Sequence, residues 1–125
     1  MTGDSEVANT PTVLIVDDDE SLRLLCRVTL ELEGYRIAEA CSVGEAEHAL
    51  AGENVDLVLL DVQVGADDGL TLMRSLRARG ATPPVVLFTG TAELDPATRL
   101  AADGVVPKPF QLDELLGVVR TLVRG

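Results

Sequence analysis

Four short segments of this chain carry side chains that could bind a cation or transfer a charged group. Three consecutive aspartates, 17–19, follow one apolar run, and Asp61 follows a second. Thr89 and Gly90 end a third run, and Lys108 stands between two prolines after a fourth. Carboxylates, a hydroxyl and an ammonium together suit a divalent cation and a phosphoryl group. A carboxylate can itself attack phosphorus, which gives an aspartyl phosphate.

The apolar runs indicate where these groups lie in the fold. Runs 13–16, 55–60, 85–88 and 105–106 are short and rich in Val, Leu and Ile, as in strands buried on both faces of a parallel sheet. Segment 35–40 alternates apolar and polar residues, as an edge strand does. In open α/β sheets, ligands bind outside the carboxyl ends of the strands. We therefore expect the acids, the hydroxyl and the lysine to meet at one rim.

Helical patterns separate the strands. The first follows Asp19 and is closed by Gly34. Its expected apolar face consists of Leu22, Leu25, Val28 and Leu32. Cys26 on the same helix is expected to pack in the core. A second helix is predicted after Ser42, because Ser42 and Glu45 have capping-box spacing.

Three further helices are predicted in the second half of the chain. One buries Leu72, Met73 and Leu76, turns a row of arginines (74, 77 and 79) to water, and ends at Gly80. A short one begins at Asp95-Pro96. The last covers 111–123 and has the clearest helical spacing of apolar residues. Alternation of strands and helices predicts an α/β fold, a doubly wound parallel sheet of five strands with five helices on both faces.

The acidic residues have two interpretations. Asp18 or Asp19 could simply cap the first helix, because aspartate is a common N-cap. Asp61 is harder to explain in this way, since the next helix begins near Asp68, too far downstream. Carboxylates gathered in one crevice repel each other and need a compensating cation. Lys108 alone is not enough, and an all-oxygen site with open water positions fits Mg²⁺.

Composition limits the classes of function. The 125 residues include 21 acidic and 10 basic side chains, and the net charge of −11 argues against nucleic acid and anionic membranes as partners. No apolar run reaches the ~20 residues that span a bilayer, and no secretory leader is visible. Two cysteines without metal-binding or redox spacing suit a reducing interior. We expect a cytoplasmic protein with a flexible tail over 1–11 and one domain over 12–124.

Five motifs in order give the chain a resemblance to a known family. They are 13–19, 59–61, 68–69, 87–90 and 107–110. Together they resemble the CheY-like receiver domain of response regulators in two-component signalling. The resemblance covers nearly the whole chain and implies a flavodoxin-like sheet with strand order 2-1-3-4-5.

The resemblance also implies a role for each site residue. Asp61 would accept phosphate from a phosphohistidine and help to bind Mg²⁺. Asp18 would bind Mg²⁺ directly and Asp17 largely through water, and the main-chain carbonyl of Gln63 would complete the protein ligands.

The remaining roles concern the phosphoryl group. Thr89 would donate a hydrogen bond to a phosphoryl oxygen, assisted by the main-chain N–H groups of Val62 and Gly90. Lys108 would pair with Asp61 before phosphorylation and with the phosphoryl group afterwards, and the peptide bond to Pro109 is expected to be cis.

Three positions depart from the family pattern. Val105 replaces the usual aromatic of the last strand, so coupling through a rotating ring is in doubt. Gly65 replaces a proline after the acceptor, which is expected to loosen that loop. Ala101 replaces a common glycine before the last strand, where a small adjustment is expected.

The implied partners are a sensor histidine kinase or phosphotransfer protein and a downstream protein that contacts the 89–123 surface. A phosphorylation-dependent homodimer is a further possibility. Because the sequence stops right after the last expected helix, we expect output through protein contacts rather than direct nucleic acid binding. We expect a switch that catalyses only its own phosphorylation and dephosphorylation.

Two other functions fit parts of the sequence. In a haloacid-dehalogenase-like phosphatase, Asp17 would be the nucleophile and Asp19 the acid. In a degenerate receiver, the same fold would serve as an unphosphorylated docking module.

Overall fold

The computed structural model describes residues 10–80, 83–90 and 94–123. Residues 1–9 of the predicted tail lie outside the described residues, whereas the carbonyl of Pro11 already accepts a hydrogen bond from the N–H of Arg36. The strands are β1 (Thr12–Val16), β2 (Arg36–Ala40), β3 (Leu57–Asp61), β4 (Gln63–Val64), β5 (Asp67–Asp68), β6 (Val85–Thr89) and β7 (Gly104–Pro107). The helices are α2 (Glu20–Leu32), α3 (Val43–Gly52), α4 (Gly69–Ala78), α5 (Pro96–Ala101) and α6 (Leu112–Leu122).

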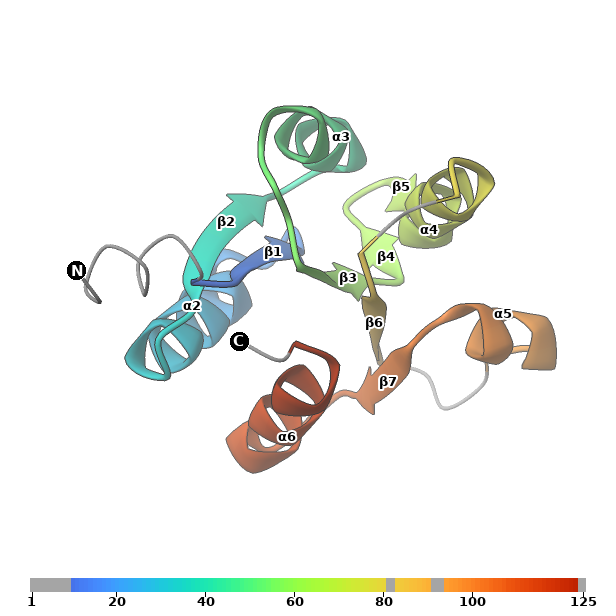
Figure 1. Ribbon diagram of the computed structural model, residues 1–125. Helices are drawn as coiled ribbons and strands as arrows, with labels where there is room; N and C mark the ends of the chain where they lie inside the picture. Colours follow the sequence, from blue (N-terminus) through green and yellow to red (C-terminus); the bar gives the residue numbers. More distant parts are fainter. Residues whose placement is uncertain (1–9, 81–82, 91–93, 124–125) are drawn as a thin grey trace.

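The predicted parallel sheet is confirmed. Its strands lie in the order β2-β1-β3-β6-β7, which is 2-1-3-4-5 once the small β4–β5 hairpin is set aside, and all neighbouring pairs are parallel (Figure 1). β1, β3 and β6 are buried at every position, as their continuous apolar runs predicted. β2, the alternating segment, lies at an edge and is mostly partly exposed.

Helices cover both faces of the sheet. α2 and α6 lie on one face, and α3 and α4 lie on the other (Figure 1). Each face has its own apolar core: Phe88 and Leu115 belong to the first, and Leu60 and Leu72 to the second. Short α5 buries no residue of its own. Among the described helices, none combines the length and the apolar character that crossing a bilayer requires.

The apolar face predicted for the first helix is wrong. Cys26 and Leu30 are the buried residues of α2, whereas Leu25 and Val28 are about half exposed and Leu32 is 81% exposed. Only Leu22 of the predicted set packs against the core. The error arose because apolar residues extend well beyond the core face, over a wide arc that leaves only one flank charged, so spacing alone did not distinguish the buried part of that arc. Core packing of Cys26 is confirmed, and burial raises the pKa of its thiol to about 12.

One predicted surface residue has a structural role instead. Arg74 and Arg79 are exposed, but Arg77 is half-buried and donates to the main-chain carbonyl of Ala101. It also pairs with Asp103 at 2.6 Å. The same Asp103 oxygen accepts the N–H of Val85 at 2.8 Å. Arg77 therefore joins α4 to the start of β6 and to the connection between α5 and β7.

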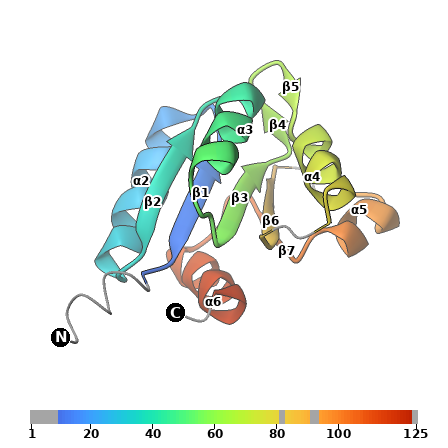
Figure 2. The ribbon, with the colours of Figure 1, turned by 45° about the horizontal axis from the view of Figure 1, so that its top comes forward.

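An unpredicted hairpin follows β3. β4 and β5 pair antiparallel, with Gly65 at the first turn position and a φ of 60° there (Figure 2). That is the position at which type II′ hairpin turns favour glycine. Gly65 thus allows a tight turn here, and the looser loop expected from the resemblance stays a prediction.

Candidate functional site

Three carboxylates meet at the rim where β1 and β3 end. Asp17 and Asp18 directly follow β1, and Asp61 is the last residue of β3. Because β1 and β3 are adjacent and parallel, their carboxyl ends lie side by side. Carboxylate oxygens of the three residues all lie within 4.8 Å of one another. Asp17 is fully buried and Asp61 nearly so, whereas Asp18 is exposed.

Lys108 points into this cluster, as the sequence predicted. Its Nζ donates to Asp61 Oδ2 at 3.0 Å and to Asp17 Oδ2 at 3.2 Å. The N–H of Lys108 donates to the carbonyl of Thr89 at 2.7 Å, and the Lys108–Pro109 bond is cis. Two residues on, the ring of Phe110 stacks on Phe88 at 5.1 Å between centroids. The main chain of the lysine is thus held on β6.

Thr89 and Gly90 lie at the end of β6, beside β3, which ends in Asp61. The register pairs Asp61 with Phe88, so Thr89 lies one residue beyond Asp61 along the rim. Thr89 is buried and Gly90 is exposed. The N–H of Val62 donates to the carbonyl of Phe88 at 3.1 Å. In this state it is bonded within the sheet, and it could assist a phosphoryl group only by exchanging that partner.

The loop after β3 closes tightly around Asp61. The N–H of Gln63 donates to Asp61 Oδ1 at 3.2 Å, and the Gln63 side chain donates to the carbonyl of Gly65 at 2.8 Å. Gly69 approaches so closely that an added Cβ would lie 2.0 Å from the carbonyl oxygen of Asp61. The Asp68-Gly69 pair of the sequence motif therefore has two structural roles: Asp68 caps α4, and Gly69 leaves room for the main chain of Asp61.

The capping interpretation holds for one aspartate and not for the others. Asp19 is the N-cap of α2, and its Oδ1 accepts the N–H groups of Ser21 and Leu22. Asp17 instead accepts the N–H of Asp19 at 2.9 Å on one oxygen and Lys108 on the other.

Burial and neighbouring charges shift the pKa values of Asp17 and Lys108. Burial raises the pKa of Asp17, and the neighbouring Asp61 charge adds to this, against the opposing hydrogen bond from Asp19 and the charge of Lys108. For Lys108, burial alone would lower the pKa, but the hydrogen bond to Asp61 and the charges of Asp17 and Asp61 outweigh it. The pKa of Lys108 is therefore raised, and the lysine stays an ammonium at neutral pH.

The residues present fit a divalent cation. Three carboxylates and one ammonium leave two uncompensated negative charges when all are ionised. The donors are all oxygens, and one of them is on the exposed Asp18, so bound waters could complete the coordination. Mg²⁺ matches that charge and that ligand set.

Two residues near the cluster were not predicted from the sequence. Arg23 donates from Nη1 to the carbonyl of Asp17 at 2.7 Å and from Nε to Glu39 at 3.2 Å. A signal was present, because a cation in the first turn of a helix opposes the helix dipole and so indicates a compensating partner. Glu39 on the edge strand had no such local signal.

The fold and the rim define a doubly wound α/β protein with an acidic cluster and a lysine at the carboxyl ends of its strands, where such folds bind ligands. Within that class, the model of the response regulator receiver domain matches residues 13–120. The chain belongs to this family, whose members act as signalling switches between histidine kinases and downstream effectors.

Curated relatives agree with this assignment. The chain is 37% identical over 114 residues to the transcriptional regulatory protein CpxR of Klebsiella pneumoniae, covering 90% of this chain and 49% of that protein. It is 37% identical over 120 residues to PetR of Rhodobacter capsulatus, covering 94% of this chain and 50% of that protein. The chain thus spans about half the length of the curated relatives it matches.

Solved receivers share the fold. The receiver domain of Francisella response regulator 1452 aligns with a TM-score of 0.84 at 26% identity, covering 90% of this chain and 96% of that one. TrrA of Thermotoga maritima, in complex with Mg²⁺-BeF, aligns with a TM-score of 0.83 at 31% identity, covering 91% of this chain and 100% of that one.

Proposed function

We propose that this domain is a phosphoacceptor switch in which Asp61 takes phosphate from a phosphohistidine of a sensor kinase or phosphotransfer protein in the cytoplasm. The observation that carries the proposal is the pairing of Asp61 with Lys108 inside a cluster of three carboxylates. Asp61 is the member whose side chain is partly accessible, 12% exposed, while also bonded to a cation. Asp17, at 0%, has no comparable access to an incoming phosphorus.

In the transfer step, a carboxylate oxygen of Asp61 attacks phosphorus and forms the O–P bond. The P–N bond to the donor histidine breaks, and its electron pair returns to the imidazole nitrogen. Lys108 keeps its proton, moves with the charge and pairs with a phosphoryl oxygen. Asp18, Asp61 and the Gln63 carbonyl, with Asp17 acting largely through water, would hold Mg²⁺, whose charge would stabilise the phosphoryl group.

The end of β6 would sense the new group. Thr89 and Gly90 directly follow Phe88, the residue that pairs with Asp61, and the Thr89 hydroxyl and the Gly90 N–H would donate to phosphoryl oxygens. The N–H of Val62 would join them by leaving the carbonyl of Phe88, which loosens the contact between β3 and β6. Phosphorylation adds about −1.5 to −2 charge, so these shifts bias two pre-existing states.

Output would pass through the 89–123 surface. Val105 on β7 is only partly buried and α5 has no fully buried residue, so small shifts there meet less packing resistance than in the central strands. Lys108 joins this surface to the acid cluster, since its main chain bonds to Thr89 and its ammonium bonds to Asp61. A downstream protein, or a second copy in a phosphorylation-dependent homodimer, would bind this surface.

Acetyl phosphate with Mg²⁺, followed by intact mass, tests the proposal. Wild type should gain one phosphoryl group and Asp61→Asn should gain none, while Asp17→Asn should still be labelled, more slowly. Loss of labelling in Asp17→Asn with labelling kept in Asp61→Asn would favour the phosphatase. A folded wild-type protein that binds Mg²⁺ and is never labelled would favour the degenerate receiver.

A further inference from the structure

Arg23 lies in the first turn of α2 and reaches back over the segment that carries two of the acids. Its N–H donates to the carbonyl of Asp19 at 3.0 Å as the first bond of the helix. Its guanidinium donates to the carbonyl of Asp17 at 2.7 Å. One residue thus bonds to the main chain at both ends of the 17–19 turn, and it holds the peptide that links Asp17 to Asp18.

The guanidinium is itself held in place. Its Nε pairs with Glu39 on β2 at 3.2 Å, and the Arg23 side chain is only 15% exposed. The N–H of Asp17 donates to the carbonyl of Ala40, the next residue on β2, at 3.1 Å. Both main-chain polar groups of Asp17 are therefore connected to the edge strand β2. The N–H bonds to it directly, and the carbonyl is linked to it through Arg23 and Glu39.

We infer that Arg23 is a positioning residue for the cation site: it fixes the turn that presents Asp17 and Asp18. This inference rests on the proposed Mg²⁺ site. Residues that orient metal ligands through hydrogen bonds typically contribute about 10–100-fold to metal affinity. The positive charge of Arg23 acts in the opposite direction, because a nearby cation repels Mg²⁺. Removing Arg23 therefore weakens binding if positioning dominates and tightens it if charge dominates.

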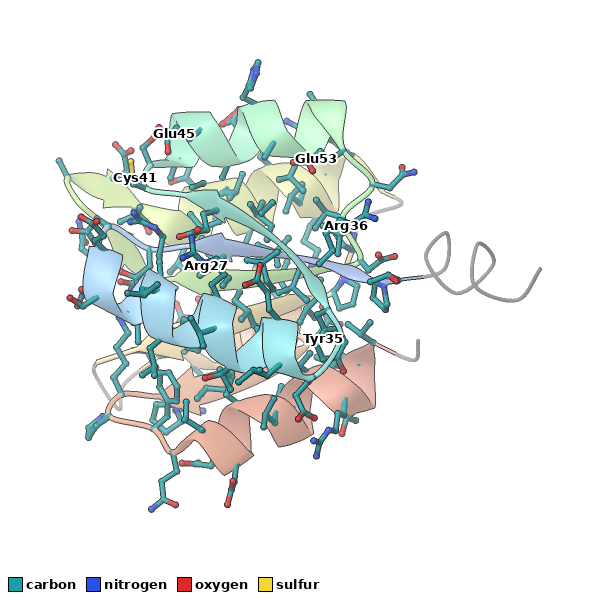
Figure 3. All side chains as sticks on the ribbon, turned by 90° about the vertical axis from the view of Figure 1, so that its left-hand side faces the viewer. Arg27, Tyr35, Arg36, Cys41, Glu45 and Glu53 are labelled. Carbon is teal, nitrogen blue, oxygen red and sulfur yellow. The ribbon has the colours of Figure 1, made fainter. Side chains whose placement is uncertain are left out.

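Arg27 provides a matched control one helical turn further on. It lies on the side of α2 turned toward β2, as Figure 3 shows, and pairs with the other oxygen of Glu39 at 2.9 Å. Its side chain is 41% exposed, and among the hydrogen bonds described for it none reaches Asp17. Like Arg23→Gln, Arg27→Gln removes one positive charge and one ion pair with Glu39. Unlike it, Arg27→Gln leaves the hydrogen bond from Arg23 to the carbonyl of Asp17 in place.

The test is titration of the metal-free full chain with Mg²⁺ by calorimetry. Arg23→Gln should bind Mg²⁺ at least about tenfold more weakly than wild type, and Arg27→Gln should stay within about twofold. Arg23→Lys keeps the charge without the two-point contact and should also bind more weakly. Thermal unfolding checks that each variant is folded, and if Arg23→Gln is not, Arg23→Lys decides.

A second measurement distinguishes an effect of Arg23 on Mg²⁺ binding from an effect on the phosphoryl-transfer step. In acetyl phosphate labelling, the half-saturating Mg²⁺ concentration should rise for Arg23→Gln, while the rate at saturating Mg²⁺ stays within about twofold of wild type. Equal Mg²⁺ affinity of Arg23→Gln and Arg27→Gln, or tighter binding by Arg23→Gln, would overturn the inference alone. Failure of the wild type to bind Mg²⁺ would instead overturn the proposed cation site.

Discussion

At the scale of single residues, Asp17 is the carboxylate whose burial at the site is unfavourable. Its carboxylate is fully buried beside a second carboxylate, and burial raises its pKa. A raised carboxyl pKa means that the folded state holds the proton more tightly than the unfolded chain. Stability from this group is therefore fully present below the ordinary value of 3.8 and is lost as pH rises through the raised pKa. At neutral pH, a bound cation would offset that loss.

The corresponding prediction concerns Mg²⁺ and pH together. The rise in melting temperature on adding Mg²⁺ should be largest at neutral pH and should shrink as pH falls through the raised pKa of Asp17, because protons and metal compete for the carboxylate. Thermal unfolding followed by circular dichroism, with and without Mg²⁺, measures it. In Asp17→Asn the Mg²⁺ effect should be small at every pH. An effect in wild type that grows on acidification would contradict the argument.

At the scale of elements, α2 shows how packing selects one face within the wide apolar arc of a helix. Cys26 and Leu30 face the sheet, and the ion pairs of Arg23 and Arg27 with Glu39 tie one flank to the edge strand. Asp19 caps the helix at the rim. The element therefore has two functions: it covers one face of the sheet, and its first turn holds the acids.

A matched pair of leucines tests this helix register. Leu30→Ala should lower the free energy of unfolding by ~2–5 kcal/mol, because Leu30 is fully buried and its removal leaves a cavity. Leu32→Ala should change it by less than ~0.5 kcal/mol, since Leu32 is 81% exposed. Urea unfolding of both variants gives the two values. Equal costs would mean that α2 is rotated relative to the structure.

At the scale of the whole molecule, the net charge of −11 acts on every part of the fold. Acidic side chains outnumber basic ones 21 to 10, so the folded chain repels itself as well as other polyanions. The same field favours an approaching cation or a basic partner surface.

The prediction at this scale is a salt effect. Raising ionic strength from ~0.01 M to ~0.15 M shortens the screening length from ~30 Å to ~8 Å and should raise the melting temperature of the metal-free protein. Asp61→Asn should keep most of this increase, because it removes only one of 21 acidic groups. If the salt-dependent rise in melting temperature disappears in Asp61→Asn, the repulsion among acidic groups arises from the cluster alone.

The sequence by itself determined the order of the elements and the rim at which the polar residues gather. Apolar runs, caps such as Ser42 and Asp95, and the Pro-Lys-Pro turn are local signals, since each depends on neighbours within a few residues. The convergence of Asp17, Asp61 and Lys108 then followed from parallel strands, whose carboxyl ends share one edge.

Only the tertiary structure decided how distant segments contact each other. Which face of α2 is buried, the bond of Arg23 to the carbonyl of Asp17 and the pairing of Arg77 with Asp103 depend on residues far apart in the chain. The N–H of Val62, assigned by resemblance to the phosphoryl group, is bonded to Phe88 because β3 and β6 pair in this register. Local patterns specify elements, but a hydrogen-bond partner across the sheet is chosen by packing, and packing depends on the whole chain.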